Sequence, residues 1–109
     1  MKSTTNTQRV RTGLDQLNQR GWSELQGRRV ALLCHPASVD HTFEHITQSC
    51  HRHGIDVVRC FGPEHGIWAD AQDMIGVDDS QIEPVTGAPV TSLYGHDLAS
   101  LTPKPQDFE

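Results

Sequence analysis

The amino-acid sequence predicts an α/β protein with a partial, Rossmann-like parallel sheet and crossover helices. Two apolar runs, residues 29–34 and 56–61, have the composition of buried parallel strands. Between them lies a stretch of helical periodicity that ends in a glycine. This β-loop-α-turn-β unit occupies about 33 residues, which is the length of one right-handed parallel crossover.

The first elements are a polar lead over residues 1–7 and a short amphipathic helix over residues 8–20. The apolar positions of that helix recur at i, i+4 and i+7 and are Val10, Leu14 and Leu17. Gly21 is expected to end the helix, and Trp22 then supplies an apolar anchor.

The next elements are the first strand and the crossover helix. Residues 29–34 form a continuous apolar run, which predicts a strand buried on both faces of the sheet. Pro36 follows in a loop and forbids further ladder pairing. Asp40 is expected to cap a helix that continues to about His53 and stops at Gly54.

The second strand is predicted over residues 56–61, and a third over residues 90–95 after a turn at 86–89. The polar stretch 69–80 between them has the composition of a solvated loop or lid. A sheet of this size with one clear crossover helix cannot cover both of its faces. Residues 8–109 are therefore expected to be the amino-terminal part of a larger α/β domain.

Composition limits the partners and the compartment. Nine Lys and Arg against 14 Asp and Glu give a formal charge of −5, which argues against nucleic acid and against anionic membrane surfaces. The longest apolar run, residues 30–34, is far shorter than the roughly 20 residues of a membrane helix. The cysteines Cys34, Cys50 and Cys60 show no CxxC spacing and are expected to be reduced and mostly buried. With no signal segment in the sequence, these features predict a cytoplasmic location.

The candidate chemistry lies at the carboxyl ends of the strands, where open α/β sheets bind their ligands. Three loops are expected at that edge, over residues 35–40, 62–67 and 95–97. The middle loop holds the carboxylate of Glu64 and the imidazole of His65. A carboxyl group in a partly apolar loop can have its pKa raised toward the range of a general acid. A plain turn with solvated side chains is the alternative, and composition alone does not decide between them.

Metals and cofactors have weaker support. His41 and His45 are expected one turn apart on the crossover helix, a spacing that suits zinc, but no third ligand, HExxH or CxxC accompanies them. A solvated helix flank is the preferred interpretation. The acidic stretch 70–79 lacks the ligand order of a calcium loop, and no glycine-rich nucleotide motif occurs. The sequence therefore predicts no metal and no cofactor.

Five separated motifs occur in an order and spacing that resembles one family. They are TGLD (12–15), LQGRRV (25–30), FGPEHGI (61–67), DAQDMIGV (70–77) and TGAPVTSLYG (86–95). Together they resemble the amino-terminal part of the exo-β-N-acetylmuramidase family, also called DUF1343. Family members are much longer than this chain, so the resemblance is to an amino-terminal fragment of them.

The resemblance implies a fold and an activity. The fold is a Rossmann-like domain with a smaller auxiliary domain, which would lie outside these 109 residues. The activity is a glycoside hydrolase that releases N-acetylmuramic acid from the non-reducing ends of peptidoglycan fragments, in peptidoglycan recycling. Glu64 is implied as the catalytic acid, with His65 orienting it or binding the sugar. His35, Gly66 and Tyr94 are the expected contacts to the amino-sugar substrate.

Two departures from the family pattern affect these expectations. Cys34 and His35 stand where the family usually has Thr-Asn, so an imidazole replaces a binding amide. Trp68 and Ala69 stand where many members have Arg-Gly. The second group that glycoside cleavage requires is not identified, and the oligomeric state is left open. A non-catalytic remnant, acting at most as a sugar-binding or interaction module, is the alternative to an enzyme.

Overall fold

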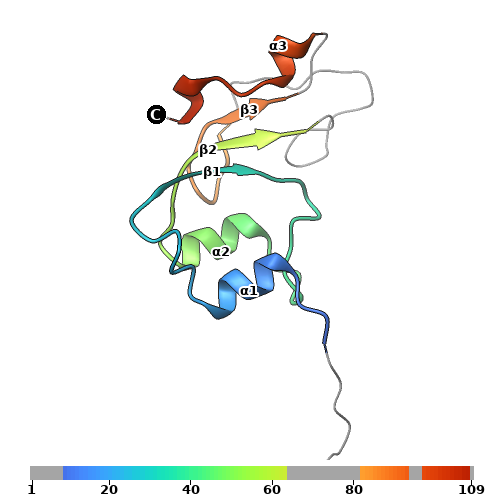
Figure 1. Cartoon of the computed structure of the whole chain (residues 1–109), viewed down its shortest axis with the longest axis vertical. Helices are drawn as coiled ribbons and strands as arrows, with labels where there is room; N and C mark the ends of the chain where they lie inside the picture. The colour runs from blue at the N-terminus through green and yellow to red at the C-terminus, as the bar shows by residue number, and fades with distance from the viewer. Residues whose placement is uncertain (1–8, 64–81, 94–96, 109) are drawn as a thin grey trace, which may run out of the picture.

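The computed structural model describes residues 9–63, 82–93 and 97–108. Three parallel strands form one sheet in the order β1-β2-β3, and they are β1 (Arg29–Leu33), β2 (Asp56–Gly62) and β3 (Val90–Ser92). The helices are α1 (Gly13–Gln19), α2 (Ile46–Arg52), α3 (Leu98–Leu101) and the 3-10 helix η1 (Pro105–Phe108). Figure 1 shows α1 and α2 on one side of the sheet and the C-terminal segment on the other. The prediction of an α/β protein with a partial parallel sheet is confirmed.

Helix α1 begins later than predicted, because Thr12 caps it. The Thr12 hydroxyl accepts a hydrogen bond from the Asp15 N–H at 3.1 Å, and the Asp15 carboxylate accepts one from the Thr12 N–H at 3.0 Å. This reciprocal pair is a capping box, which satisfies backbone donors that a helix start otherwise leaves free. The apolar periodicity that extended the predicted helix back to residue 8 includes Val10, which is 85% exposed.

Helices α1 and α2 end in the same way. Gly21 and Gly54 follow the two helices with φ of +64° and +67°, the left-handed region that favours glycine. The next residue in each case, Trp22 or Ile55, donates its N–H at 2.9 Å to a carbonyl in the last helical turn. The accepting carbonyls are those of Leu17 and Cys50. These Schellman motifs place both apolar side chains in the core, and the predicted helix ends are confirmed.

Helix α2 begins at Ile46, so the predicted helix start near Asp40 is wrong. The Asp40 carboxylate instead closes a tight turn, in which it accepts hydrogen bonds from the N–H groups of Thr42 and Glu44 at 2.8 and 3.0 Å. Phe43 in this turn has φ +66°, which no helical residue adopts. Aspartate favours both turns and helix starts because its carboxylate accepts hydrogen bonds from nearby backbone N–H groups. The sequence pattern therefore does not distinguish a turn from a helix start at Asp40.

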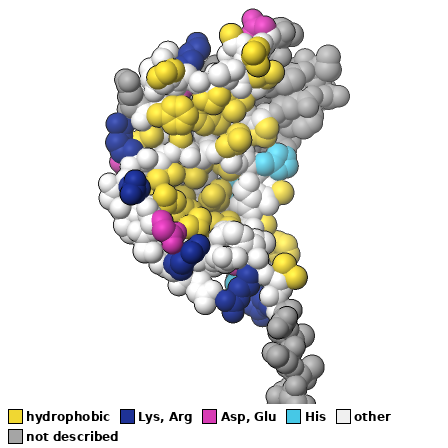
Figure 2. Space-filling view, in the orientation of Figure 1, with side chains coloured by type: hydrophobic (Ala, Val, Ile, Leu, Met, Phe, Trp, Pro, Cys, Tyr) yellow, Lys and Arg dark blue, Asp and Glu magenta, His cyan; other side chains and the backbone are white. Residues whose placement is uncertain are grey.

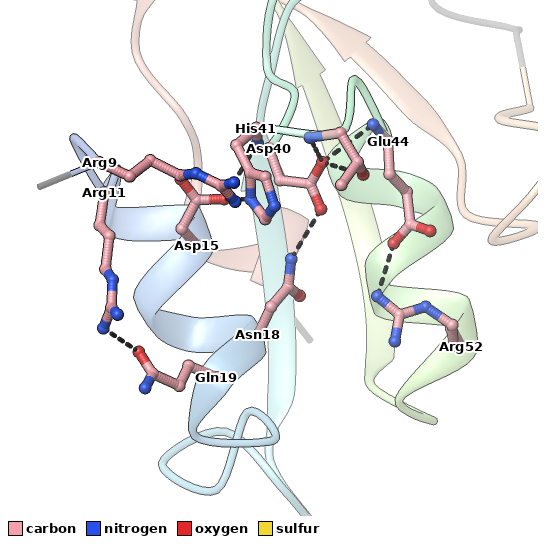
Figure 3. Close-up of a pocket in the computed structure, with 10 residues that line it drawn as sticks. Arg9, Arg11, Asp15, Asn18, Gln19, Asp40, His41, Glu44 and Arg52 are labelled. Atoms are coloured by element: carbon pink, nitrogen blue, oxygen red, sulfur yellow. Dashed lines mark hydrogen bonds and ion pairs between the residues drawn. The ribbon is translucent and has the colours of Figure 1, made fainter. Parts of the chain in front are cut away.

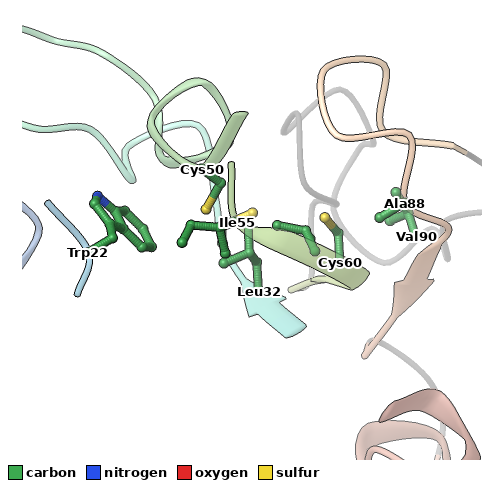
Figure 4. Packing of buried hydrophobic residues seen from close by; sticks show 9 residues of the cluster. Trp22, Leu32, Cys50, Ile55, Cys60, Ala88 and Val90 are labelled. Atoms are coloured by element: carbon green, nitrogen blue, oxygen red, sulfur yellow. The ribbon is translucent and has the colours of Figure 1, made fainter. Parts of the chain in front are cut away.

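The core lies between the sheet and the helices α1 and α2 (Figure 4). Trp22 is 1% exposed, donates its indole N–H to the Asn18 side-chain oxygen at 2.7 Å, and stacks on the His53 ring at 6.1 Å. Leu32 from β1 and Cys60 from β2 are opposite one another in the register and face this side. Every helix within the described residues is too short or too polar to cross a membrane.

The second face of the sheet is only partly covered. Phe61 of β2 packs on the Phe108 ring, with centroids 5.6 Å apart, and Arg59 donates a hydrogen bond to the Asp107 carbonyl at 3.3 Å. Leu33, however, is 66% exposed, and Figure 2 shows hydrophobic side chains on the surface over the sheet. The prediction that residues 29–34 are buried on both faces is therefore wrong, because within the described residues the helices cover one face well and the other in part.

Candidate functional site

The three strands end at one edge of the sheet, and the loop that follows β1 at this edge is described throughout. That loop, residues 34–45, carries His35. The central strand β2 ends at Gly62, and Pro63 follows it. The other candidates from the sequence, Glu64, His65, Gly66 and Tyr94, lie outside the described residues.

His35 occupies an exposed turn directly after β1. Its carbonyl accepts a hydrogen bond from the Ser38 N–H at 2.8 Å, and its own N–H donates to the Ser38 hydroxyl at 3.1 Å. The ring atom Nδ1 accepts the Ala37 N–H at 3.2 Å, so in the neutral ring the proton is on Nε2. This ring nitrogen makes no hydrogen bond to any described residue.

His45 fixes the His35 turn to the start of α2. Its Nδ1 accepts the Thr47 N–H at 3.3 Å and therefore caps the helix, while Nε2 lies 2.9 Å from the His35 carbonyl and donates to it. Both ring nitrogens are thus used inside the structure. The expectation that His41 and His45 share a helix face is wrong, since both precede Ile46. Among the described residues, no group of three or more His, Cys, Asp or Glu side chains is placed to hold a metal.

The first helix anchors the other half of this loop. The Asp15 carboxylate accepts hydrogen bonds from the His41 N–H at 3.0 Å and from its ring at 2.7 Å, and Asn18 donates to the Asp40 carboxylate at 3.1 Å. These hydrogen bonds hold the pKa of Asp15 well below its usual range, and the bond from the His41 N–H contributes most. The Thr42 hydroxyl does the same for the pKa of Asp40. The loop bearing His35 is therefore held by ionised carboxylates on the helix side.

The three cysteine thiols are free and buried, as predicted. A hydrogen bond with the Cys60 thiol, together with burial, raises the pKa of Cys34 far above its usual range. Burial raises the pKa of Cys50 to about 12. Because the thiolate is the nucleophilic form of cysteine, neither residue is suited to nucleophilic catalysis near neutral pH. A hydrogen bond with Cys34 lowers the pKa of Cys60, but this thiol is 0% exposed, so a substrate does not reach it.

A buried carboxylate that the sequence analysis did not single out shapes the entry to β3. Glu83 is 2% exposed and accepts hydrogen bonds from the Val85 N–H at 3.1 Å and from the N–H and hydroxyl of Thr86, both at 2.6 Å. The turn then passes through Gly87, whose φ is +73°. In the sequence, the one sign of this turn is a glutamate three residues before a Thr-Gly pair. Glu83 is occupied by its own turn, so it has a structural role.

The fold and this edge define a class of protein. It is an α/β protein that presents an exposed imidazole after one strand and a Gly-Pro pair at the end of the next, at the edge where such sheets bind small ligands. Residues 30–109 match the family described as exo-beta-N-acetylmuramidase NamZ, N-terminal. The chain belongs to this family, and the resemblance inferred from the five motifs is confirmed.

Two relatives illustrate the relationship. The chain is 38% identical over 90 residues to the peptidoglycan beta-N-acetylmuramidase NamZ of Bacillus subtilis, a match that covers 80% of this chain and 21% of that protein. A crystal structure of a DUF1343 family protein from Bacteroides fragilis superposes with a TM-score of 0.74 at 29% identity, covering 91% of this chain and 23% of that one. The chain therefore spans less than a quarter of the length of either relative.

Proposed function

We propose that this chain carries the acid-bearing part of an exo-β-N-acetylmuramidase active site. The reaction would release N-acetylmuramic acid from the non-reducing ends of peptidoglycan fragments. The observation that carries the proposal is the end of β2: the central strand of the sheet stops at Gly62, two positions before Glu64 in the sequence. Family membership and the similarity to a peptidoglycan beta-N-acetylmuramidase support it.

Glycoside cleavage divides the work between two groups. An acid protonates the leaving oxygen, and a carboxylate or the substrate's own acetamido oxygen stabilises the cation-like sugar. We assign the first role to Glu64, with His65 orienting it or binding the sugar. His35 is proposed to donate from Nε2 to a substrate oxygen, which suits the tautomer that its turn selects. Gly66 and Tyr94 are the further proposed sugar contacts. The proposed reaction uses no metal or cofactor.

The test is a chimera in which this chain replaces the matching segment of the Bacillus subtilis relative. Hydrolysis of a chromogenic N-acetylmuramic acid glycoside is measured for the chimera and for Glu64→Gln. Loss of a general acid is expected to lower turnover by about 10²–10⁴-fold and to remove the alkaline limb of the pH profile. Glu24→Gln is the matched control, because Glu24 is a half-exposed residue paired with Arg20 on the surface. Normal turnover of Glu64→Gln would show that the acid is another residue.

A second candidate function is a non-catalytic sugar-binding or interaction module. It is favoured by the 66% exposure of Leu33 on the sheet, an apolar side chain that a partner could cover. The 109-residue chain, titrated with N-acetylmuramic acid, distinguishes the two candidates. Saturable binding without release of product from a glycan favours the module, whereas turnover by the chain rejects it.

The location in the cell stays a prediction. The sequence favours the cytoplasm, and fractionation of cells that express the tagged chain measures it. Recovery of the chain outside the cytoplasmic fraction would contradict the prediction.

A further inference from the structure

A polar groove lies on the helix side of the molecule, between α1, the turn at residues 40–44 and α2 (Figure 3). Its volume is about 930 Å³. Ten residues line it, and they are Arg9, Arg11, Asp15, Asn18, Gln19, Asp40, His41, Thr42, Glu44 and Arg52. His35, the described residue proposed for sugar contact, is not among them. The groove is thus lined by residues other than the His35 turn.

The carboxylates of this groove are already satisfied by the protein. Asp15 accepts from His41 and from the Thr12 N–H, as described above. Asp40 accepts from Asn18 on one oxygen and from its own turn on the other. Glu44 accepts on Oε1 from the Ser49 hydroxyl at 2.6 Å and from Arg52 at 2.8 Å, which pairs its charge with a guanidinium. The acidic groups therefore hold the walls together and offer little to a ligand.

The hydrogen-bond donors of the groove are mostly unused. Arg9 forms no hydrogen bond or ion pair with any described residue, although a guanidinium carries five N–H donors. Arg11 uses one nitrogen, Nη1, which donates to the Gln19 side-chain oxygen at 2.8 Å. That bond also turns the Gln19 amide so that its NH₂ remains available. Three of the nine Lys and Arg residues in an acidic chain gather here.

We infer that this groove binds the carboxylate or phosphate group of a small molecule. Guanidinium groups match such oxyanions because two parallel N–H donors meet two oxygens, and charge-assisted bonds of this kind are stronger than neutral ones. Arg9 and Arg11 both come from the segment before α1, and Figure 3 shows them on the same side of the groove. Each carboxylate that lines the groove already accepts hydrogen bonds from the protein, which disfavours a cation, and a neutral sugar lacks the negative charge that pairs with a guanidinium. This inference does not rest on the proposed muramidase activity.

The experiment follows the arginine side-chain Nε–Hε signals of the ¹⁵N-labelled, 109-residue chain by NMR. Sodium phosphate and sodium lactate serve as the phosphate and carboxylate probes, at constant ionic strength, and N-acetylglucosamine is the neutral probe. The Arg9 and Arg11 signals are expected to shift saturably with an oxyanion and to stay in place with N-acetylglucosamine. Whichever oxyanion binds more tightly identifies the source of the charged group.

Variants locate the binding. Arg9→Gln and the double variant Arg9→Gln/Arg11→Gln are expected to weaken the oxyanion affinity, the latter at least about tenfold. Arg28→Gln is the matched control, because Arg28 is exposed and does not line the groove. The inference is overturned by the absence of a saturable shift with either oxyanion, by equal binding of N-acetylglucosamine, or by an equal loss in Arg28→Gln. Arg9→Gln leaves the Arg11–Gln19 contact in place, so its result is independent of any change in α1.

Discussion

The two faces of the sheet differ in what covers them. On one face, Leu32 and Cys60 are 6% and 0% exposed, because Trp22 and the helices α1 and α2 lie over them. On the other face, Phe61 is covered by Phe108, but Leu33 is 66% exposed. Consecutive leucines in β1 thus have opposite environments. The composition of a strand shows that it is apolar, and the layers packed on it decide which of its side chains stabilise the fold.

The described part of the candidate site, the loop that carries His35, lies at the edge shared by the two faces, yet contacts from the covered side hold it. The loop that carries His35 is tied to α2 by His45 and to α1 by the contacts of Asp15 and Asp40. The open side reaches β2 through Arg59 and Phe108. Changes to the covered side should therefore disturb both stability and the loop, whereas changes to the open side should leave the loop in place.

The largest expected effect is that of Trp22→Ala. It leaves a cavity between α1, α2 and the sheet and removes the indole bond to Asn18, so the free energy of unfolding should fall by about 3–5 kcal/mol. Phe108→Ala on the open face, where the ring is 47% exposed, is expected to cost about 1 kcal/mol or less. Urea denaturation measures both variants. Equal losses would show that the two faces contribute alike.

The sharpest comparison is between adjacent leucines. Leu32→Ala should lower the free energy of unfolding by about 2–4 kcal/mol, because the residue is buried under the helices. Leu33→Ala removes the same atoms from an exposed position and should change it by less than about 0.5 kcal/mol. The two variants remove the same atoms from adjacent positions of one strand, so their difference reports the layers that cover the two faces. A large loss in Leu33→Ala would mean that another layer covers this face in solution.

Lowering the pH should reduce the folding stability of the covered side gradually, and by less than the core substitutions do. Hydrogen bonds lower the pKa values of Asp15, Asp40 and Glu44, so the folded chain holds these groups ionised more firmly than the unfolded chain. This stability is complete above the pKa of an unfolded carboxyl group, about 4, and is lost as the pH falls below it. The melting temperature is therefore expected to fall as the pH is lowered from about 5 to about 3. Asp15→Asn should show a shallower drop, and an unchanged drop would contradict the assignment.

The most local effect concerns the attachment of η1 to the open face. Arg59→Met keeps the aliphatic stem but removes the bonds to the Thr91 hydroxyl at 3.0 Å and to the Asp107 carbonyl. A loss of about 1 kcal/mol is expected, together with faster amide exchange in η1. Exchange at the His35 turn should not change. Faster exchange at both places would show that the two sides are coupled.

Much of the fold could be predicted from local sequence signals. The glycines after both helices were recognised because a left-handed residue is needed there, and the strands were recognised from their apolar runs. The start of α1 was misplaced although Thr12 and Asp15 carry the spacing of a capping box. The start of α2 was misplaced because an Asp caps a turn and a helix with the same bond. The position of a helix start depends on whether the helical or the turn conformation is more stable over a few residues.

The candidate site divides in a similar way. The sequence placed His35 in the loop after the first strand, and the structure confirms that position. Its tautomer and its support by His45 could not be predicted, because they depend on contacts across the loop. The polar groove between α1 and α2 could not be predicted, because its lining residues are spread along the chain from residue 9 to residue 52. Glu64 and its neighbours stay predictions that rest on the motif and on the end of β2.

By itself, the sequence determined the class of the fold, the order of the strands along the chain, and membership of a muramidase family. These features depend on hydrophobic periodicity, glycine positions and motifs, all of which are local along the chain. Only the tertiary structure decided which face of the sheet is buried, which histidines are occupied, and where free arginine donors gather. These features depend on packing and hydrogen bonds between residues far apart in the sequence, and a linear pattern does not specify such contacts.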